Sequence, residues 1–275
     1  MIQREHYLKK IRPFYDSDLI KIITGIRRCG KSVILSQIHN ELDSMEKKTV
    51  YLDFDILSVR RKYPDAVLLT EYIESLIPER GMLYVFLDEI QNVDDWNQAV
   101  RTLRLERCSV FISGSNSRLL SGEFTKELSG RYVSFRVRPF VYKEAVMYME
   151  QLGRTYSIAD YLVWGGFPVA LAQTDTESRK TYLNDLNSTI IYNDIENRHN
   201  IRRKEIFEKL TDFILCSNSR IFSAQSISRY LKGQNIAISV PTVIKYLDYL
   251  KEAYVTGTIR DRPRTPCTAG RCARS

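Results

Sequence analysis

Short hydrophobic runs alternate with amphipathic stretches along the first half of the chain. The apolar runs are rich in β-branched residues, which is typical of buried strands. The stretches between them repeat hydrophobic residues three or four positions apart, as Ile34, Ile38, Leu42 and Met45 do, which predicts helices. Strands are expected at residues 19–24, 49–54, 82–87, 108–113 and 132–137, and helices at 32–46, 65–77 and 94–105.

This alternation predicts the fold class. Strands that alternate with helices are joined by right-handed crossovers and form a mostly parallel sheet. Such strands are covered on both faces and therefore have continuous apolar sequences, as these do. We expect an α/β fold with a parallel five-stranded sheet flanked by helices.

The pattern changes after Pro139, where helical spacing dominates. Helices are expected at 141–152, 157–163 and 176–196, with a turn at 165–168. A compact trio of helices follows, one at 204–216, one capped by Ser223 and one capped by Ser239. The strand-like run TGTIR comes next, and three helices before a strand indicate a winged helix-turn-helix.

Composition excludes several classes of protein. The chain has 275 residues, 44% hydrophobic and 27% charged, which is ordinary for a globular protein with a real core. No window holds the roughly 18 uncharged apolar residues of a membrane span. The N-terminus lacks the apolar run of a secretory signal, and the five cysteines form an odd, scattered set that favours reduced thiols. We expect a cytoplasmic protein with no membrane partner.

The charge balance is basic but uneven. The formal net charge is +8 and the isoelectric point is near 9.2. Residues 260–275 alone hold five arginines and one aspartate. A basic balance permits an acidic partner such as nucleic acid, but a solvated basic surface explains it equally well.

One segment carries recognisable chemistry. Residues 25–32 are GIRRCGKS and match G-x-x-x-x-G-K-[ST] at every fixed position. In this motif the glycines let backbone N–H groups approach phosphates, the lysine reaches the β- and γ-phosphates, and the hydroxyl ligates Mg²⁺. The predicted strand and helix on either side supply the setting that the motif needs, because a helix N-terminus favours an anion. An ordinary glycine-containing turn with an exposed lysine is less consistent with this setting.

We therefore expect ATP and Mg²⁺ as cofactors. The expected phosphate-binding residues are Gly25, Ile26, Arg27, Arg28, Cys29, Gly30, Lys31 and Ser32.

Two acids follow the third predicted strand, at the edge where ligands bind in open α/β sheets. Asp88 is expected to hold the magnesium through water, together with Ser32. Glu89 is expected to polarise the attacking water as a general base. The alternative for both is a pair of solvated acids in a loop, which the neighbouring phosphate motif disfavours. A glutamate here also disfavours a small-molecule kinase, which has no need to activate water.

Two further elements are candidates for catalysis. Ser115 and Asn116 follow the fourth strand, and if that strand lies between those ending at Thr24 and Leu87, either residue can orient the attacking water. Arg131 is the best candidate for an arginine finger, which stabilises charge on the transferred phosphoryl group. For Arg131, an exposed arginine in a turn is the simpler interpretation of the residues alone.

These motifs together resemble a known family. The segments GIRRCGKS, FLDEIQNVDDW, SGSNSRLLSGE, LSGRY with RPF, GGFP and IIYNDI are similar to prokaryotic AAA+-like P-loop ATPases with a C-terminal, winged-helix-like domain of unknown function. The resemblance runs from about residue 2 to about residue 255. It implies the sheet order 5-1-4-3-2, a catalytic glutamate at Glu89, a sensor at Ser115 or Asn116, and a finger at Arg131.

The expected organisation has four parts. They are an AAA+-like ATP-binding domain at 1–139, a helical lid or linker at 140–200, a winged-helix-like domain at 201–260 and a disordered tail at 261–275. The tail has no periodicity, and family members usually continue with a different sequence. We expect it to come from a frameshift or a premature stop.

The leading functional hypothesis is an Mg-dependent ATPase that acts as a nucleotide-driven conformational switch. The alternative is a DNA-binding regulator whose winged helix is controlled by ATP. The recognition helix of such a module would carry Lys245 and Lys251 but also Asp248 and Glu252, a poor phosphate-contacting face. A protein partner, DNA and a homo-oligomer all remain open.

Overall fold

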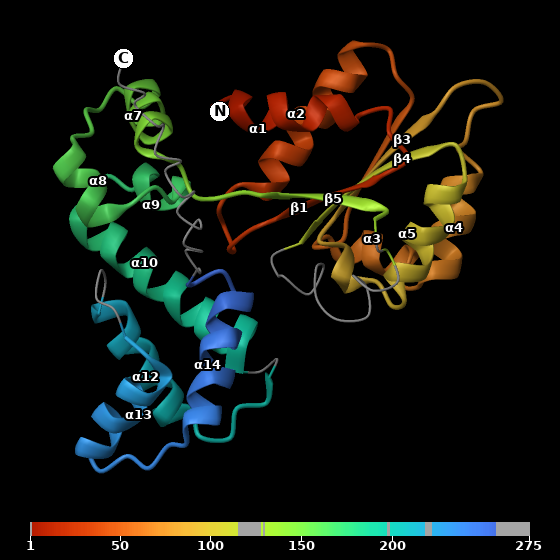
Figure 1. Cartoon of the computed structure of the whole chain (residues 1–275). Helices are drawn as coiled ribbons and strands as arrows, with labels where there is room; N and C mark the ends of the chain where they lie inside the picture. Colours follow the sequence, from red (N-terminus) through yellow and green to blue (C-terminus); the bar gives the residue numbers. More distant parts are fainter. Residues whose placement is uncertain (1, 115–127, 129, 197–198, 218–221, 257–275) are drawn as a thin grey trace, which may run out of the picture.

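The computed structural model describes residues 2–114, 128, 130–196, 199–217 and 222–256 (Figure 1). Within these residues, five parallel strands form one sheet in the order β2-β3-β4-β1-β5. The strands are β1 (Ile20–Thr24), β2 (Thr49–Asp53), β3 (Leu83–Asp88), β4 (Cys108–Gly114) and β5 (Tyr132–Arg136). The predicted strands, the α/β class and the sheet order implied by the family resemblance are confirmed.

The register of the sheet brings the ends of its central strands together. Thr24 at the end of β1 pairs with Gly114 of β4 on one side and with Arg136 of β5 on the other. On the far side of β4, Leu87 of β3 pairs with Ile112. Strand β4 therefore lies between β1 and β3, and all three end at the same edge.

Helices cover both faces of the sheet (Figure 1). Helices α1 (Glu5–Ile11) and α2 (Lys31–Ser44) pack on one face, in a cluster that includes Ile23. Helices α3 (Leu57–Lys62), α4 (Ala66–Glu74) and α5 (Trp96–Leu105) pack on the other, in a cluster that includes Ile22. Short 3₁₀-helices occupy Arg12–Phe14 and Ile90–Asn92. Neighbouring residues of a strand point to opposite faces of the sheet. Because helices cover both faces, β1 is apolar throughout.

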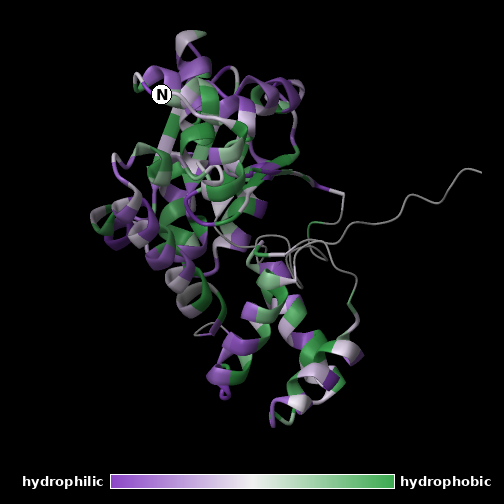
Figure 2. Ribbon diagram, turned by 90° about the vertical axis from the view of Figure 1, so that its left-hand side faces the viewer, coloured by the Kyte–Doolittle hydropathy of each residue, from purple (hydrophilic) through white to green (hydrophobic). Residues whose placement is uncertain are grey.

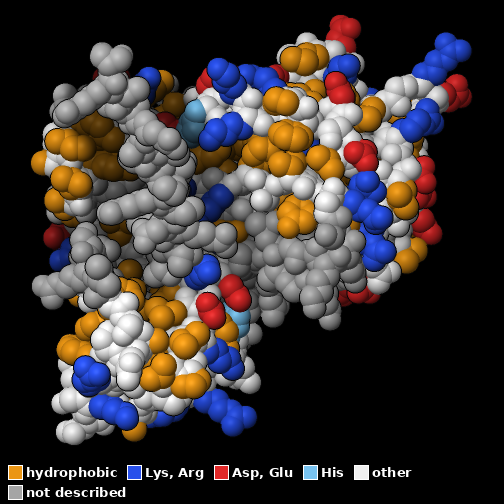
Figure 3. Space-filling view, viewed as in Figure 1, with side chains coloured by type: hydrophobic (Ala, Val, Ile, Leu, Met, Phe, Trp, Pro, Cys, Tyr) orange, Lys and Arg blue, Asp and Glu red, His pale blue; other side chains and the backbone are white. Residues whose placement is uncertain are grey.

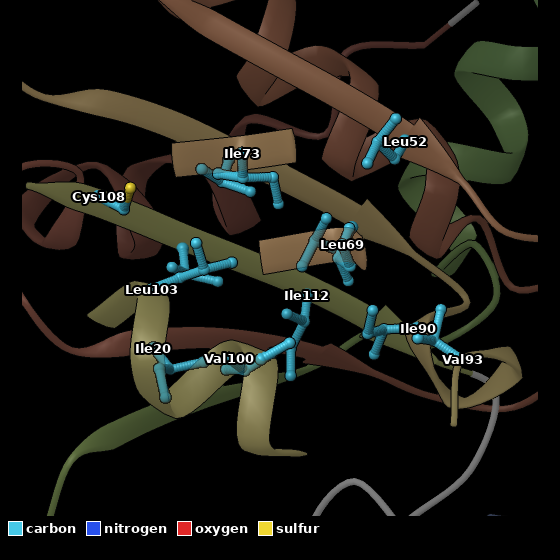
Figure 4. Close-up of a cluster of buried hydrophobic side chains, with 14 of the residues drawn as sticks. Ile20, Leu52, Leu69, Ile73, Ile90, Val93, Val100, Leu103, Cys108 and Ile112 are labelled. Atoms are coloured by element: carbon cyan, nitrogen blue, oxygen red, sulfur yellow. The ribbon is translucent and has the colours of Figure 1, made fainter. Parts of the chain in front are cut away.

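The cluster beneath α4 and α5 shows how this pattern builds a core. Leu69 and Ile73 from α4, and Val100 and Leu103 from α5, are all fully buried beside the strands (Figure 4). The ribbon coloured by hydropathy shows the same layering, with hydrophobic strands inside and polar stretches on the outer helices (Figure 2). The sequence did not predict α1 or α3, whose few turns give a weak periodic signal.

The chain after β5 is helical. Its α-helices are α7 (Tyr142–Gln151), α8 (Ile158–Trp164), α9 (Pro168–Ala172), α10 (Thr176–Thr189), α12 (Lys204–Cys216), α13 (Ala224–Gly233) and α14 (Val240–Glu252). The predicted caps Ser223 and Ser239 are confirmed, since each side chain accepts a hydrogen bond from a backbone N–H of the first turn. The expected helix at 176–196 differs, because the α-helix ends at Thr189 and continues as a π-helix, Ile190–Glu196.

A separate hydrophobic cluster holds the C-terminal helices together. It includes Leu186 of α10, Phe207 of α12, Leu231 of α13 and Leu250 of α14. Helix α10 therefore connects this helical bundle to the region that follows the sheet. All but the first residue of the strand-like run after α14, and the whole tail, lie outside the described residues, so the winged-helix interpretation stays a prediction.

The helices that directly follow the sheet leave several hydrophobic side chains exposed to solvent. Helix α8 has no buried residue, and Leu162 and Val163 are 79% and 70% exposed. Hydrophobic side chains also gather on the left-hand, helical side of the molecule in the space-filling view (Figure 3). Within the described residues, no helix combines the length and the apolar character that crossing a membrane requires.

The backbone of Gly166 packs closely against the backbone of Phe140, in the segment that follows the sheet. The N–H of Phe140 donates to the carbonyl of Gly166 at 2.8 Å, and a Cβ at position 166 would lie 1.9 Å from the Phe140 oxygen. We expect Gly166→Ala to lower the free energy of unfolding in urea by about 1–3 kcal/mol or more, because the backbones must separate. Gly233→Ala is the control, since nothing lies within 4 Å of a Cβ there. Equal stability of the two variants would contradict this packing.

Candidate functional site

The phosphate-binding motif forms the loop between β1 and α2. Gly25 has a φ of +150°, and a Cβ there would lie 2.2 Å from the carbonyl oxygen of Val137. Gly30 has a φ of +96° and is the N-cap of α2. Residue 25 must therefore be glycine for steric reasons, while residue 30 requires the left-handed conformation that glycine adopts freely.

Lys31 lies at the centre of this loop. Its side chain is only 4% exposed, although it carries an ammonium group. The Nζ atom donates to the carbonyl of Ile26 at 3.3 Å and lies 4.0 Å from Oε1 of Glu89. A buried cation at the N-terminus of a helix, between a carbonyl and a distant carboxylate, is well placed to receive a phosphate.

Asp88 ends β3 and lies beside the loop with 2% of its surface exposed. The hydroxyl of Ser113 donates to its Oδ1 atom, and the phenol of Tyr51 donates to its Oδ2 atom at 3.0 Å. Burial, with the charge of Asp88, raises the pKa of Tyr51, so the phenol keeps its proton and remains a donor. Two hydroxyls from neighbouring strands therefore fix the orientation of this carboxylate.

Glu89 reaches the site through an unusual backbone conformation. Its φ is +50°, in the left-handed region that non-glycine residues rarely adopt. Consecutive residues of a regular strand point to opposite faces, so this turn lets Glu89 approach Lys31 although Asp88 precedes it. Its N–H donates to the Ser113 hydroxyl at 3.3 Å, and Gln91 donates to its Oε2 atom.

The residues fit a magnesium ion that is bound together with phosphates. Ser32 is exposed on the first turn of α2, and Asp88 forms no ion pair with any residue that the structure describes. Across the same residues, no group of three or more His, Cys, Asp or Glu side chains could hold a metal by itself. Magnesium is usually bound through one or two carboxylates plus substrate phosphates, which is the set of oxygen ligands available here.

The sheet places the remaining predicted residues in two different locations. Ser115 and Asn116 lie outside the described residues, but β4, which precedes them, does lie between β1 and β3. Arg131 precedes β5, and Tyr132 pairs with Ile20 at the start of β1. The exposed Arg131 is therefore at the amino edge, roughly 15 Å of strand away from the phosphate loop.

A buried arginine from the N-terminal segment supports the loop from outside. Arg4 is 1% exposed and donates to both carboxylate oxygens of Glu144, with Nε and Nη2 each at 2.8 Å. Its remaining hydrogen bonds go to the carbonyls of Cys29, at 3.1 Å, and Arg138, at 2.9 Å. One guanidinium thus connects the phosphate loop, the segment after β5 and the start of α7.

Sequence reasoning did not identify Arg4, Tyr51 or Ser113 as functional candidates. Ser113 had a signal, because it is a polar residue near the end of a strand that is otherwise buried. Arg4 had none, since its partners are 25 to 140 residues away along the chain. The motif therefore located the loop, while the contacts that hold it required the structure.

Comparison with known families agrees with this geometry. Residues 17–146 match the family model described as an AAA domain. Residues 155–262 match a model described as a domain of unknown function, DUF8612.

Two relatives match over most of the chain. An uncharacterized protein of Haemophilus influenzae is 32% identical over 265 residues, covering 93% of this chain and 66% of the relative. An uncharacterized protein of Methanocaldococcus jannaschii is 29% identical over 247 residues, covering 86% of this chain and 55% of the relative. The chain thus spans between about half and two thirds of the length of these relatives.

Similar solved structures are more distant. The Aeropyrum pernix ORC1 protein in complex with DNA has a TM-score of 0.44 at 13% identity, over 93% of this chain and 84% of that one. AMPPCP-bound DnaA from Aquifex aeolicus has a TM-score of 0.44 at 14% identity, over 92% and 89%. Likeness at this level carries no argument about activity or partners.

The Arg4–Glu144 pair gives a prediction about stability. Glu144→Gln keeps the shape of the side chain but removes its charge, which leaves the buried guanidinium without a counter-ion. We expect the free energy of unfolding in urea to fall by about 3–5 kcal/mol. Glu150→Gln, an exposed position on the same helix, is the matched control and should change little. If both variants unfold alike, the pair does not stabilise the loop and α7 as we describe.

Proposed function

We propose that this chain, which belongs to the P-loop ATPases with an AAA domain and a C-terminal domain of unknown function, binds Mg–ATP and hydrolyses it. The observation that carries the proposal is the buried ammonium of Lys31. It lies at the N-terminus of α2, 4.0 Å from Glu89, at the edge where β1, β3 and β4 end. An exposed lysine in an ordinary turn would have neither the burial nor the acidic neighbour.

Each residue then has a defined role. The loop residues 25–32 bind the phosphates through backbone N–H groups, and Lys31 balances the charge of the β- and γ-phosphates. Ser32 and Asp88 would hold Mg²⁺, and the ion would supply positive charge beside the phosphates. Glu89 takes a proton from water as the new O–P bond forms and the bond between the γ-phosphorus and the ADP oxygen breaks. Either Ser115 or Asn116 orients that water.

The position of Glu89 favours hydrolysis over transfer to another substrate. Gln91 donates to its carboxylate, Lys31 lies 4.0 Å from it, and the backbone N–H of Glu89 donates to the Ser113 hydroxyl. A carboxylate placed beside the lysine can polarise water directly. The proposed outcome is ADP and phosphate, with the free energy used to move the helical regions relative to the sheet as a conformational switch.

Two variants test the proposal through phosphate release and nucleotide binding. Lys31→Ala should abolish ATP binding, because the buried cation for the phosphates is lost. Glu89→Gln should bind ATP normally but lower the turnover rate by about 10²–10⁴-fold, because proton transfer to the base is lost. The controls are Lys47→Ala and Glu79→Gln, which are exposed positions of the same residue types. Normal turnover in Glu89→Gln would refute the assignment of the base.

We further propose that Arg131 acts on the nucleotide of a neighbouring copy. Its place at the amino edge of the sheet, away from its own loop, supports this proposal. Arg131→Ala should lower the turnover rate by about 10³-fold, whereas the exposed Arg229→Ala should not change it. Mixing Arg131→Ala with Lys31→Ala should restore part of the activity, since each copy supplies what the other lacks. A mixture no more active than its components would exclude a finger in trans.

A further inference from the structure

The phosphate loop is in direct contact with the C-terminal helices. Ile26 is half-buried and packs both on the cluster beneath α2 and on the cluster that holds α10, α12, α13 and α14 together. Burial raises the pKa of Tyr182 on α10, and the positive charge of Arg28 opposes that rise. Two loop residues, Ile26 and Arg28, therefore lie next to helices of the C-terminal region.

A third contact comes from Tyr254, two residues beyond the end of α14. Its φ is +60°, the left-handed conformation that follows a helix C-cap, and the Val255 N–H donates to the Leu250 carbonyl at 2.9 Å across this turn. The guanidinium carbon of Arg136 lies 4.6 Å from the centre of its ring. Because Arg136 pairs with Thr24 in the sheet, this ring lies over the ends of β1 and β5, where the phosphate loop begins.

The hydroxyls at this contact are buried. Burial raises the pKa of Tyr254, while the charge of Arg136 opposes the rise. Neither the Thr24 Oγ1 atom nor the Tyr254 phenol oxygen has a hydrogen-bond partner within the described residues. Two buried hydroxyl groups without partners are unfavourable, so a rearrangement that gives either one a partner lowers the free energy.

We propose that Tyr254 is a positioning residue for the phosphate loop, through which nucleotide at the loop is coupled to α14. This inference rests on the proposed nucleotide binding and names the contact that transmits it. The ring contacts Arg136, which pairs with the end of β1, and Ile26 provides the second, apolar connection. A change at the start of the loop therefore reaches the end of α14 through Arg136 and the ring of Tyr254.

Hydrogen exchange with and without the non-hydrolysable analogue AMPPCP tests this coupling in the full chain. In the unsubstituted protein, AMPPCP should slow exchange both in residues 25–32 and in α14. In Tyr254→Ala the loop should still be protected, while α14 no longer responds, and the affinity for AMPPCP should fall about two- to five-fold. Tyr254→Phe keeps the ring over Arg136 and should recover the response of α14. Tyr230→Ala, an exposed tyrosine on α13, is the matched control.

Arg136→Gln tests the same contact from the sheet and does not depend on whether Tyr254→Ala folds. It removes the cation from the ring at an exposed position and should also uncouple α14. A full response of α14 in both Arg136→Gln and a folded Tyr254→Ala would overturn the inference. Protection of residues 25–32 with no change of α14 in the unsubstituted protein would overturn the coupling alone. No protection of residues 25–32 would overturn the proposed nucleotide binding as well.

Discussion

Parallel pairing of β1 with β4, and of β4 with β3, is the constraint on which the site depends. In a parallel sheet every strand ends at the same edge, so the pairing of Thr24 with Gly114 places the loop after β1 beside the end of β4. The pairing of Leu87 with Ile112 adds the acids that follow β3. Residues almost sixty positions apart thus meet without any long loop, and the Nζ atom of Lys31 lies 4.0 Å from Oε1 of Glu89.

The sequence was informative where local patterns determine structure. Fully apolar strands, the glycines at 25 and 30 and the caps Ser223 and Ser239 are recognisable because their physical requirements lie within a few residues. The contacts that hold the loop could not be predicted in this way. Arg4 lies 25 residues before Cys29, which it contacts, and Tyr254 lies even farther along the chain from Arg136. No local periodicity relates such distant positions. Their roles follow from tertiary packing alone.

The Arg4 guanidinium shows how the loop is held from the N-terminal side. A buried charge is expensive unless its donors are satisfied, and this one is matched by a bidentate carboxylate and two carbonyls. Such a group loses most of its stabilisation when any partner moves, so it favours one arrangement of the loop, α7 and the segment after β5. The hydrogen bond from Arg4 therefore fixes the position of the Cys29 carbonyl. Cys29 belongs to the part of the loop that is expected to surround the phosphates.

The loop is therefore held at three sides by contacts of different strength. The sheet fixes Thr24 by backbone pairing, and Arg4 fixes Cys29 by charged hydrogen bonds. The C-terminal region contacts the loop through the half-buried Ile26, and it contacts Arg136 at the neighbouring end of β5 through the ring of Tyr254; both are weaker contacts. When the loop adjusts to a ligand, the weakest of these contacts changes first. Movement of the C-terminal helices, rather than of the sheet or α7, is thus the response that this arrangement favours.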